Sequence, residues 1–389
     1  ENGKAYEQDI LENGKYVVVN SRFISTDGAV RKYTDADYLI AKAGEVLMVL
    51  SDLPKGRALA KCYFVESDER YAVNQRVCRL KPRRIAGKFL YYTLNRHPRL
   101  LAYDDGLSQT HLSKGGVTEC PLCVPAQKPE QQKIAECLSS VDASVAAQAR
   151  KVDALKTHKK GLMQQLFPRE GETQPRLRFP EFQNAGEWRA TTLGRLFELQ
   201  SGFAFSSDYF GSRGKKLVTP KNFTKLGFGN FDDTVSKFTT EEAPQKYVCR
   251  PGDLLVLLTD LTPTCELLGK PLEVAEKDGD VLLNQRVAKV ELVSKGVTKP
   301  YLKQFFLTET YTEVIVKTAS GSTVKHSSNK VILNMGVVFP PPEEQQRIAN
   351  FLTTLDDLIA AQTQKLNALK THKKGLMQQL FPSPMEVTL

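Results

Sequence analysis

Ala154–Pro168 reads ALKTHKKGLMQQLFP, and Ala368–Pro382 repeats the same fifteen residues 214 positions later. The duplication extends upstream, because Glu130–Phe167 and Glu344–Phe381 align without a gap and share 25 of 38 residues. The sequences that precede the two copies are also similar to each other, but more weakly. A repeat unit of about 200 residues is far longer than the roughly 20 to 50 residues of a solenoid repeat. The chain is therefore predicted to be a duplicated unit with a variable front and a near-constant helical rear.

The duplicated segment carries the pattern of a long helix with one apolar seam. Seam positions alternate four and three residues apart from Ile134 to Leu166 and from Ile348 to Leu380. A seam held over more than four heptads is typical of a coiled coil, and polar residues on a seam usually fix register and partner. At about 1.5 Å per residue, each helix would span roughly 57 Å. The predicted seam and partner-binding residues are Leu138, Val145, Gln148, Val152, Leu155 and Leu162 in the first copy, and Leu352, Ile359, Gln362, Leu366, Leu369 and Leu376 in the second; Lys159 and Lys373 are further polar interruptions.

Composition narrows the class of protein. A length of 389 residues predicts two or three domains, and no apolar run approaches the roughly 18 residues of a transmembrane helix. The net charge of +10 and pI near 9.1 favour a polyanionic partner such as nucleic acid. Seven cysteines are an odd number without regular spacing, which indicates a reducing compartment.

Cys120-Pro-Leu-Cys123 is the one spacing that suggests zinc. A structural zinc site needs four ligands, and the sequence has no second pair of this kind. In the repeat, Cys120 and Cys123 align with Met335 and Val338. We therefore expect apolar positions inside a strand and no metal.

The remaining sequence divides into two variable units of mixed α and β character. The predicted order is a first domain over 1–124, a helix over 125–168, a linker over 169–187, a second domain over 188–340, a helix over 341–382 and a tail over 383–389. In the first domain, strand runs lie at Tyr16–Val19, Tyr38–Ile40, Val46–Leu50 and Val73–Leu80, and a helix is predicted from Gly87 to about Arg96. Gly3-Lys-Ala-Tyr parallels Gly202-Phe-Ala-Phe, so the first domain is expected to lack its N-terminal part.

Motifs for catalysis are absent from the sequence. It contains no phosphate-binding loop, no glycine-rich dinucleotide motif, no zinc-protease motif and no amino-methyltransferase motif. Asp52 and Asp260 follow equivalent apolar runs and could be catalytic carboxylates, but no second carboxylate or base recurs beside them. Structural capping is the preferred interpretation. We therefore expect no catalytic residue and no cofactor in this chain.

Two basic stretches are candidates for binding. One runs from Arg76 to Lys88 with interleaved aromatic residues, and the other runs from Arg213 to Lys225. Lysine and arginine attract phosphates without regard to sequence, whereas Arg, Asn, Gln and Ser side chains can read base edges. The alternative is an ordinary charged surface.

The order and duplication of these parts resemble the specificity subunit of type I restriction–modification systems. The motifs that carry the resemblance are the helix starts Pro125–Ala135 and Pro340–Ala349, the repeated helix tail and the linker string PRLRFPEF at Pro175–Phe182. The resemblance implies two similar mixed α/β target-recognition domains, separated by two long helices packed as an antiparallel coiled coil with pseudo-two-fold symmetry. Each domain would read one half of a split, asymmetric double-stranded DNA target, and the helices would set the spacing.

The resemblance also implies partners. Two adenine-methyltransferase subunits would bind the helices, with S-adenosylmethionine bound in those subunits, and restriction subunits would bind through them. The missing N-terminal part of the first domain departs from the family pattern. A helical scaffold that joins proteins without reading DNA is the alternative, and a methyltransferase acting alone is a third hypothesis.

The repeat itself sorts the candidate DNA-binding residues. Asn74-Gln-Arg76 recurs as Asn284-Gln-Arg286, so these residues cannot distinguish two half-sites and are expected to support the fold or contact phosphate. Specificity is expected where the copies diverge: Ser21–Lys32 against Thr219–Asn230, Leu53–Lys61 against Leu261–Lys270, and Ser108–Lys114 against Ser322–Lys330. The candidates are Ser21, Arg22, Arg76, Ser108, Gln109, Lys114, Arg213, Lys221, Asn222, Arg286 and Lys325.

Overall fold

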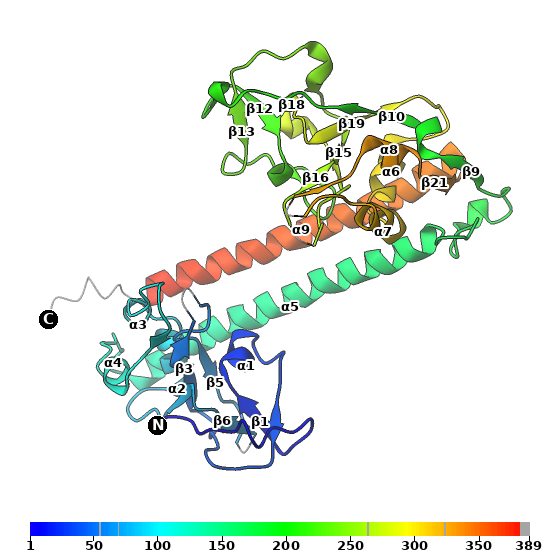
Figure 1. The fold of residues 1–389 in the computed structure, drawn as a ribbon. Coiled ribbons are helices and arrows are strands. Elements are labelled where there is room, and N and C mark those ends of the chain that lie inside the picture. The colour runs from blue at the N-terminus through cyan, green and yellow to red at the C-terminus, as the bar shows by residue number, and fades with distance from the viewer. Residues whose placement is uncertain (54–55, 69, 263, 323, 382–389) are drawn as a thin grey trace. The chain divides into compact units, whose positions relative to one another are not determined.

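The computed structural model describes residues 1–53, 56–68, 70–262, 264–322 and 324–381. Its internal contacts divide the chain into two compact units (Figure 1). Unit 1 combines Glu1–Ala149 with Lys365–Leu389, and unit 2 is Arg150–Gln364. Each unit therefore holds one variable segment, part of the long helix that follows it and part of the other long helix.

Unit 1 is built on two three-stranded sheets. The first has the order β2-β1-β6, and the second has the order β5-β3-β7. In the first sheet β1 pairs parallel with β6, and in the second β3 pairs antiparallel with both neighbours. The strands are β1 (Tyr16–Val19), β2 (Tyr33–Thr34), β3 (Val46–Val49), β4 (Ser51–Asp52), β5 (Cys62–Phe64), β6 (Tyr71–Val73), β7 (Val77–Leu80) and β8 (Thr110–His111), with β4 paired to β8.

Unit 2 repeats this plan with additional strands. The order β13-β12-β18 repeats β2-β1-β6, and the order β17-β15-β19 repeats β5-β3-β7. Strands β11, β14 and β10 extend the two sheets, while β16 pairs with β20 and β21 with β9. The strands are β9 (Arg189–Thr192), β10 (Phe197–Ser201), β11 (Phe210–Gly211), β12 (Lys215–Val218), β13 (Lys237–Thr239), β14 (Val248–Cys249), β15 (Leu254–Leu257), β16 (Thr259–Asp260), β17 (Pro271–Glu273), β18 (Val281–Leu283), β19 (Val287–Leu292), β20 (Lys325–His326) and β21 (Gly336–Phe339).

Both variable segments also contain short helices. Those of the first variable segment are α1 (Ser21–Ser25), α2 (Gly87–Leu94), α3 (Pro98–Leu101) and α4 (Lys114–Thr118), and those of the second are α6 (Lys299–Phe305), α7 (Glu309–Lys317) and α8 (Asn329–Leu333). Short 3-10 helices are η1 (Pro180–Phe182), η2 (Leu193–Arg195), η3 (Ser207–Tyr209), η4 (Pro220–Asn222), η5 (Gln245–Tyr247) and η6 (Glu276–Asp278). The long helices are α5 (Lys128–Leu166) and α9 (Pro342–Leu380), each of 39 residues.

The central strand of each unit is buried on both faces, which explains its unbroken apolar sequence. In β3, Val46 and Met48 pack in the cluster that includes Leu90 of α2. Leu47 and Val49 point to the opposite face, into the cluster of α1 and the first sheet. Leu254–Leu257 of β15 divides in the same alternating way between two clusters. The prediction of two similar mixed α/β units is confirmed.

The long helices run antiparallel within each unit. In unit 1, Leu138 near the start of α5 shares a core cluster with Leu376 and Leu380 near the end of α9. In unit 2, Leu166 at the end of α5 shares a cluster with Ile348 and Leu352 near the start of α9. The linker also packs in unit 2, because Arg178 forms an ion pair with Glu344 at 2.7 Å.

Several local predictions need correction. The predicted strand Val73–Leu80 is two strands, β6 and β7, separated by a turn in which the Val77 N–H donates to the Asn74 carbonyl. The helix predicted to reach Arg96 ends at Leu94, and α3 starts at Pro98.

Cys120 and Cys123 do not lie in a strand. Their counterparts flank or lie in β21, which is a strand because it pairs with β9, whereas the described part of unit 1 contains no strand equivalent to β9. Cys120 instead lies with its thiol 3.4 Å from Nδ1 of His97. Burial raises the pKa of the Cys120 thiol and lowers the pKa of His97, which favours the neutral form of both groups.

Candidate nucleic-acid interface and helix seam

The divergent loops of unit 1 meet around the end of strand β3. The Leu50 N–H donates to the Arg76 carbonyl at 2.9 Å, and the Leu112 N–H donates to the Leu50 carbonyl at 2.8 Å. The Asn74 N–H donates to the Val19 carbonyl at 3.1 Å, which places the start of α1 beside the same turn. We call the described residues of 20–28, 51–61, 74–76 and 104–114 the loop edge of unit 1.

The loop edge of unit 2 has the same construction. The Leu258 N–H donates to the Arg286 carbonyl at 3.0 Å, and the Ser327 N–H donates to the Leu258 carbonyl at 3.0 Å. Val218 at the end of β12 pairs with Leu283 at the end of β18, so the loop after β12 starts beside the turn that contains Arg286. We call the described residues of 219–230, 259–270, 284–286 and 320–330 the loop edge of unit 2.

Asp52 and Asp260 cap the first loop of each edge. The Asp52 carboxylate accepts hydrogen bonds from the N–H groups of Leu53, Ala58 and Leu59, at 2.7 to 3.2 Å. The Asp260 carboxylate accepts from the N–H groups of Thr262 and Leu267, at 2.9 and 2.7 Å. Carboxylates engaged in this way hold a loop in shape. Structural capping, predicted in place of a catalytic role, is confirmed.

All six candidate residues of unit 1 lie on its loop edge. Arg22, Arg76 and Lys114 are exposed, and Ser21 is half-buried in the first turn of α1. Ser108 and Gln109 are exposed but engaged, because the Ser108 hydroxyl donates to Asp105 at 3.0 Å and the Gln109 amide donates to Ser51 at 2.9 Å.

Asp105 shapes the loop that carries Ser108. Hydrogen bonds from the N–H groups of Ser108 and Leu107 and from the Ser108 hydroxyl lower the pKa of Asp105. The carboxylate therefore stays ionised and keeps this turn closed. The basic stretch contributes less surface than its sequence suggests, since Arg79 is 8% exposed and pairs with Glu1 and Glu45.

The candidate residues of unit 2 are less uniform. Lys221 and Arg286 are exposed on the loop edge, and Lys325 is half-buried in β20. Asn222 does not fit the predicted role of a base reader, because it is fully buried. Its side chain accepts from the Thr219 N–H at 2.7 Å and donates to the Asn230 carbonyl at 2.8 Å, so Asn222 holds the loop from within.

Arg213 is exposed but lies away from the other candidates of unit 2. It precedes β12, whereas Lys221 and Asn222 follow that strand. A strand of four residues spans roughly 13 Å, which places Arg213 at the opposite end of the sheet. The sequence could not show this separation, because eight residues can cover a tight turn or a whole strand.

The predicted seam residues are buried or half-buried. Leu138, Leu352 and Ile359 are fully covered, and Val152 is 3% exposed. Gln148 and Leu366 are also buried, while Val145, Leu155, Leu162, Gln362, Leu369 and Leu376 are half-buried. A seam of this kind requires that its polar members find partners.

Lys159, one predicted interruption of the seam, forms a closed polar ring in unit 2. Its ammonium lies 2.6 and 2.7 Å from the two oxygens of Asp356 and 3.1 Å from Oε1 of Gln304. The Gln304 amide donates to Asp356 at 3.0 Å. The three donors of the lysine thus have three acceptors. Burial lowers the pKa of Lys159, while the charge of Asp356 acts in the opposite direction and favours its protonated form.

Lys373, the equivalent interruption, pairs with Asp142 at 2.5 Å in unit 1. Here the third member is Tyr92 of α2, whose hydroxyl donates to Asp142 at 2.8 Å. Lys373 also lies 5.7 Å from the centre of the Tyr92 ring. Both units therefore use the same Lys–Asp pair, and each variable domain adds a different donor to the same carboxylate.

Sequence reasoning missed the two aspartates and their third partners. Asp142 and Asp356 are identical between the repeats and each follows a seam position directly, which is a usable signal. The third partners offered no such signal, because Tyr92 and Gln304 differ in chemistry although a leucine lies two positions before each.

No described helix is long and apolar enough to cross a membrane. Among the residues that the structure describes, no group of three His, Cys, Asp or Glu side chains could hold a metal ion.

The model of the type I restriction modification DNA specificity domain matches residues 1–157 and 185–371. The chain belongs to this family, whose members are the non-catalytic DNA-recognition components of restriction–modification systems. The prediction of a DNA-specificity component without its own catalysis is thus confirmed.

Curated relatives carry the same description. The type I restriction enzyme MjaVIII specificity subunit of Methanocaldococcus jannaschii is 25% identical over 308 residues, which cover 77% of this chain and 70% of the relative. The type I restriction enzyme EcoBI specificity subunit of Escherichia coli is 29% identical over 172 residues, 43% of this chain and 32% of the relative.

Solved structures share the fold. The S subunit of a type I restriction-modification system from M. genitalium has a TM-score of 0.59 at 16% identity, covering 98% of this chain and 93% of the other. A structure from work on complex assembly and conformational transition of the type I R-M system has a TM-score of 0.54 at 17% identity, covering 94% and 90%.

Proposed function

We propose that this chain reads a bipartite, asymmetric DNA target, with one variable domain for each half-site, and recruits two adenine-methyltransferase subunits. Restriction subunits would bind through the methyltransferase subunits, and S-adenosylmethionine would be bound there and not in this chain. The domain limits predicted from the sequence, 1–124 and 188–340, are the proposed limits of the two recognition domains. The cytoplasm of a bacterium or archaeon is the proposed compartment.

The observation that carries the proposal is the contrast between the two loop edges. Their supports are equivalent, since Leu50 and Leu258 make the same backbone contacts with Arg76 and Arg286. The loops on these supports differ in sequence and secondary structure, from α1 in unit 1 to the folded η4 loop in unit 2. This arrangement suits two different half-sites. The shared supports would position each domain on the DNA backbone, and the differing loops would contact different bases, because base contacts specify sequence whereas phosphate contacts only position the protein.

The near-identical helices support the recruitment of two copies of one partner. The exposed residues His158, Lys160 and Gln164 recur as His372, Lys374 and Gln378. Identical surface residues on two helices suit two identical partner subunits. A scaffold that does not read DNA would also use such helices, but it would not need loop edges that diverge between the two units.

The test is methylome sequencing of cells that carry this chain with a methyltransferase partner. The expected result is one methylated motif with two unequal halves and an unspecific spacer. Gel shifts with the methyltransferase present, at stated salt, add a second readout, because non-specific binding falls steeply with salt whereas the cognate duplex keeps an advantage. Binding without sequence preference would favour the scaffold, and methyl transfer by the chain alone would revive the enzyme hypothesis.

A further inference from the structure

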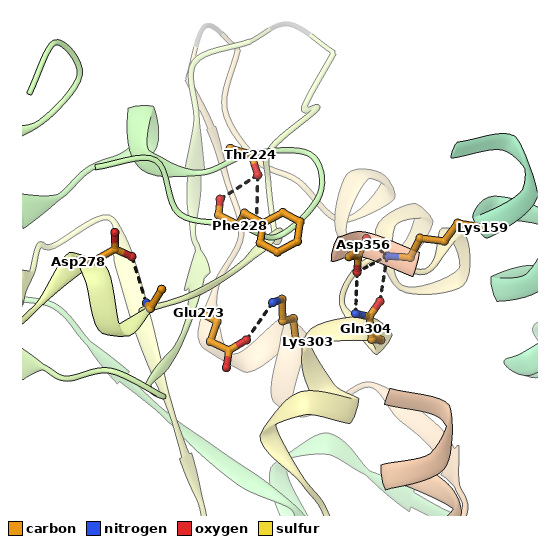
Figure 2. A network of polar contacts seen from close by, with 9 residues as sticks. Lys159, Thr224, Phe228, Glu273, Asp278, Lys303, Gln304 and Asp356 are labelled. Carbon is orange, nitrogen blue, oxygen red and sulfur yellow. Dashed lines mark hydrogen bonds and ion pairs between the residues drawn. The ribbon is translucent and has the colours of Figure 1, made fainter. Parts of the chain in front are cut away.

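Helix α6 contacts both the seam and the loop edge of unit 2 through two adjacent residues (Figure 2). Gln304 belongs to the ring with Lys159 and Asp356. Lys303 faces another way, because successive residues of a helix project about 100° apart. One turn of helix can therefore connect two parts of the unit.

The ring holds α6 on the long helices. Gln304 is fully buried, and Asp356 and Lys159 are 1% and 5% exposed. All three side chains find partners within the ring. A buried, fully satisfied network of this kind has little freedom to shift, because any displacement leaves a charge without a partner.

Lys303 holds the base of the recognition loop. Its side chain is buried, its ammonium lies 2.9 Å from Glu273 of β17, and it lies 4.8 Å from the centre of the Phe228 ring. Phe228 belongs to the divergent loop Thr219–Asn230 and pairs through its backbone with Glu273. A cation over an aromatic ring is attracted by the electrons of its face, so Lys303 contacts both sides of this pairing.

The loop above this contact is internally braced. The Thr224 hydroxyl donates to the Phe228 carbonyl at 2.8 Å and accepts from the Phe228 N–H at 3.2 Å. The Asn230 N–H donates to the Asn222 carbonyl at 2.8 Å. A loop with such internal contacts moves as one body, so its orientation depends on how its base is held.

Unit 1 builds the same position from other residues. By alignment of the strands and helices, Tyr91 takes the place of Lys303, and Phe64 of β5 takes the place of Glu273. Tyr91 and Phe64 form an aromatic pair with ring centres 6.4 Å apart in place of an ion pair. Both units thus have a hydrogen bond from the short helix to the aspartate of the long helix. The neighbouring contact of that short helix with the sheet differs, being an ion pair in unit 2 and an aromatic pair in unit 1.

We propose that Lys303 is a positioning residue for the half-site read by unit 2, holding the Thr219–Asn230 loop at a fixed orientation to the seam. This inference rests on the proposed function. Lys303 itself need not touch DNA, and its effect would be confined to one half of the target.

The experiment compares Lys303→Met, which keeps the length of the side chain, with the wild-type complex. The half-site of unit 2 is first identified by exchanging residues 189–340 with those of another family member. Methylome sequencing should then show, for Lys303→Met, a preference reduced roughly tenfold at one or more positions of that half-site, the scale of one lost base discrimination. The half-site of unit 1 should stay unchanged, which also reports on folding and assembly.

Two further variants make the result decisive. Glu273→Gln removes the same ion pair from a side chain that is 42% exposed, so it tests the inference even if Lys303→Met does not fold. Lys299→Met is the matched control, because it removes a cation from the same helix whose partner is Asp253, outside the loop edge. Glu273→Gln should reproduce the relaxed half-site, and Lys299→Met should not.

Failure of the inference and failure of the proposed function look different. If the wild-type complex methylates no bipartite motif, the proposed function is wrong. If the wild-type motif is bipartite but Lys303→Met and Glu273→Gln leave both halves unchanged, or relax both equally, the positioning role is wrong and the proposed function stands.

Discussion

At the scale of single residues, the pair of Lys159 and Asp356 is buried, whereas Lys373 and Asp142 are 29% and 35% exposed. A buried charge is tolerated only when its partner is present, and removing one partner typically costs about 3–5 kcal/mol. Replacing the whole pair by apolar residues is often neutral or stabilising. The pair of Lys159 and Asp356 is therefore expected to contribute more to register than to net stability.

Asp356→Asn should destabilise unit 2 by about 3–5 kcal/mol, because it leaves the Lys159 ammonium buried without a carboxylate. The double variant Lys159→Met/Asp356→Leu should recover most of that loss. Thermal and urea unfolding would measure both. The control is Glu309→Gln, which breaks the exposed pair of Lys160 and Glu309 and should change little. A double variant as unstable as Asp356→Asn would contradict this account.

Because of Lys270, we expect the free energy of unfolding of this protein to depend on pH. Burial lowers the pKa of Lys270 to about 8, and its ammonium contacts the Thr312 hydroxyl at 2.8 Å. Between about pH 8 and the ordinary lysine pKa, the unfolded chain binds a proton that the folded chain does not, so stability from this group rises with pH.

The Lys270→Met variant isolates that contribution. It should be more stable than wild type at pH 7, where wild-type folding must desolvate the charge or release the proton, by an amount on the order of 3 kcal/mol. The advantage should shrink as the pH rises from 8 to 10. Unfolding temperatures of both proteins across this range provide the measurement, and a constant difference would show that Lys270 does not titrate there.

Residue roles were predictable from the sequence only where the repeat exposed them. The capping role of Asp52 and Asp260 followed from their recurrence without a second carboxylate nearby. The partner of Lys159 is 197 positions away, and such pairings depend on the fold. For Asn222 the sequence suggested a role that its burial does not support. An amide in a basic stretch suggests contact with bases, but the side chain of Asn222 is fully buried beneath its own loop.

At the scale of elements, the long helices were the most predictable part of the chain. Their repeated seam placed them at 125–168 and 341–382, and they run over Lys128–Leu166 and Pro342–Leu380. Short strands were less predictable, since Ser51–Asp52 and Thr110–His111 are strands only because they pair with each other. Two-residue segments carry no periodicity that a sequence pattern could detect.

One added heptad in each of α5 and α9 should lengthen the unspecific spacer of the target. Seven residues add roughly 10 Å, which is about three base pairs of B-form DNA. The insertions belong beside Gln148 and Gln362, so that both helices keep their seam in phase. Methylome sequencing would report the spacer, and an unchanged spacer would refute the idea that the helices set it.

Insertions of four residues at the same places are the control for this experiment. They rotate the following seam out of phase and should weaken the packing of the helices. Loss of methylation, without a new and longer spacer, is the expected result.

At the scale of the whole molecule, each recognition domain is predicted to act by itself. Exchanging residues 189–340 for the equivalent segment of another family member should change one half of the methylated motif and leave the other half intact. The reason is that the loop edge of unit 2 lies entirely within this segment. Methylome sequencing of cells that carry the chimera would show which half of the motif changes. A change in both halves would contradict independent recognition of each half-site by one domain.

The polar ring has a consequence for how such proteins diversify. Both repeats of the long helix offer an aspartate at the same position, which accepts a hydrogen bond from a phenol in one domain and from an amide in the other. Recombination between genes of this family would therefore join foreign domains to a common attachment point, provided that each brought one suitable hydrogen-bond donor on its first helix after the central sheet. Natural exchange of domains would then require such a donor in addition to apolar packing of that helix against the long helices.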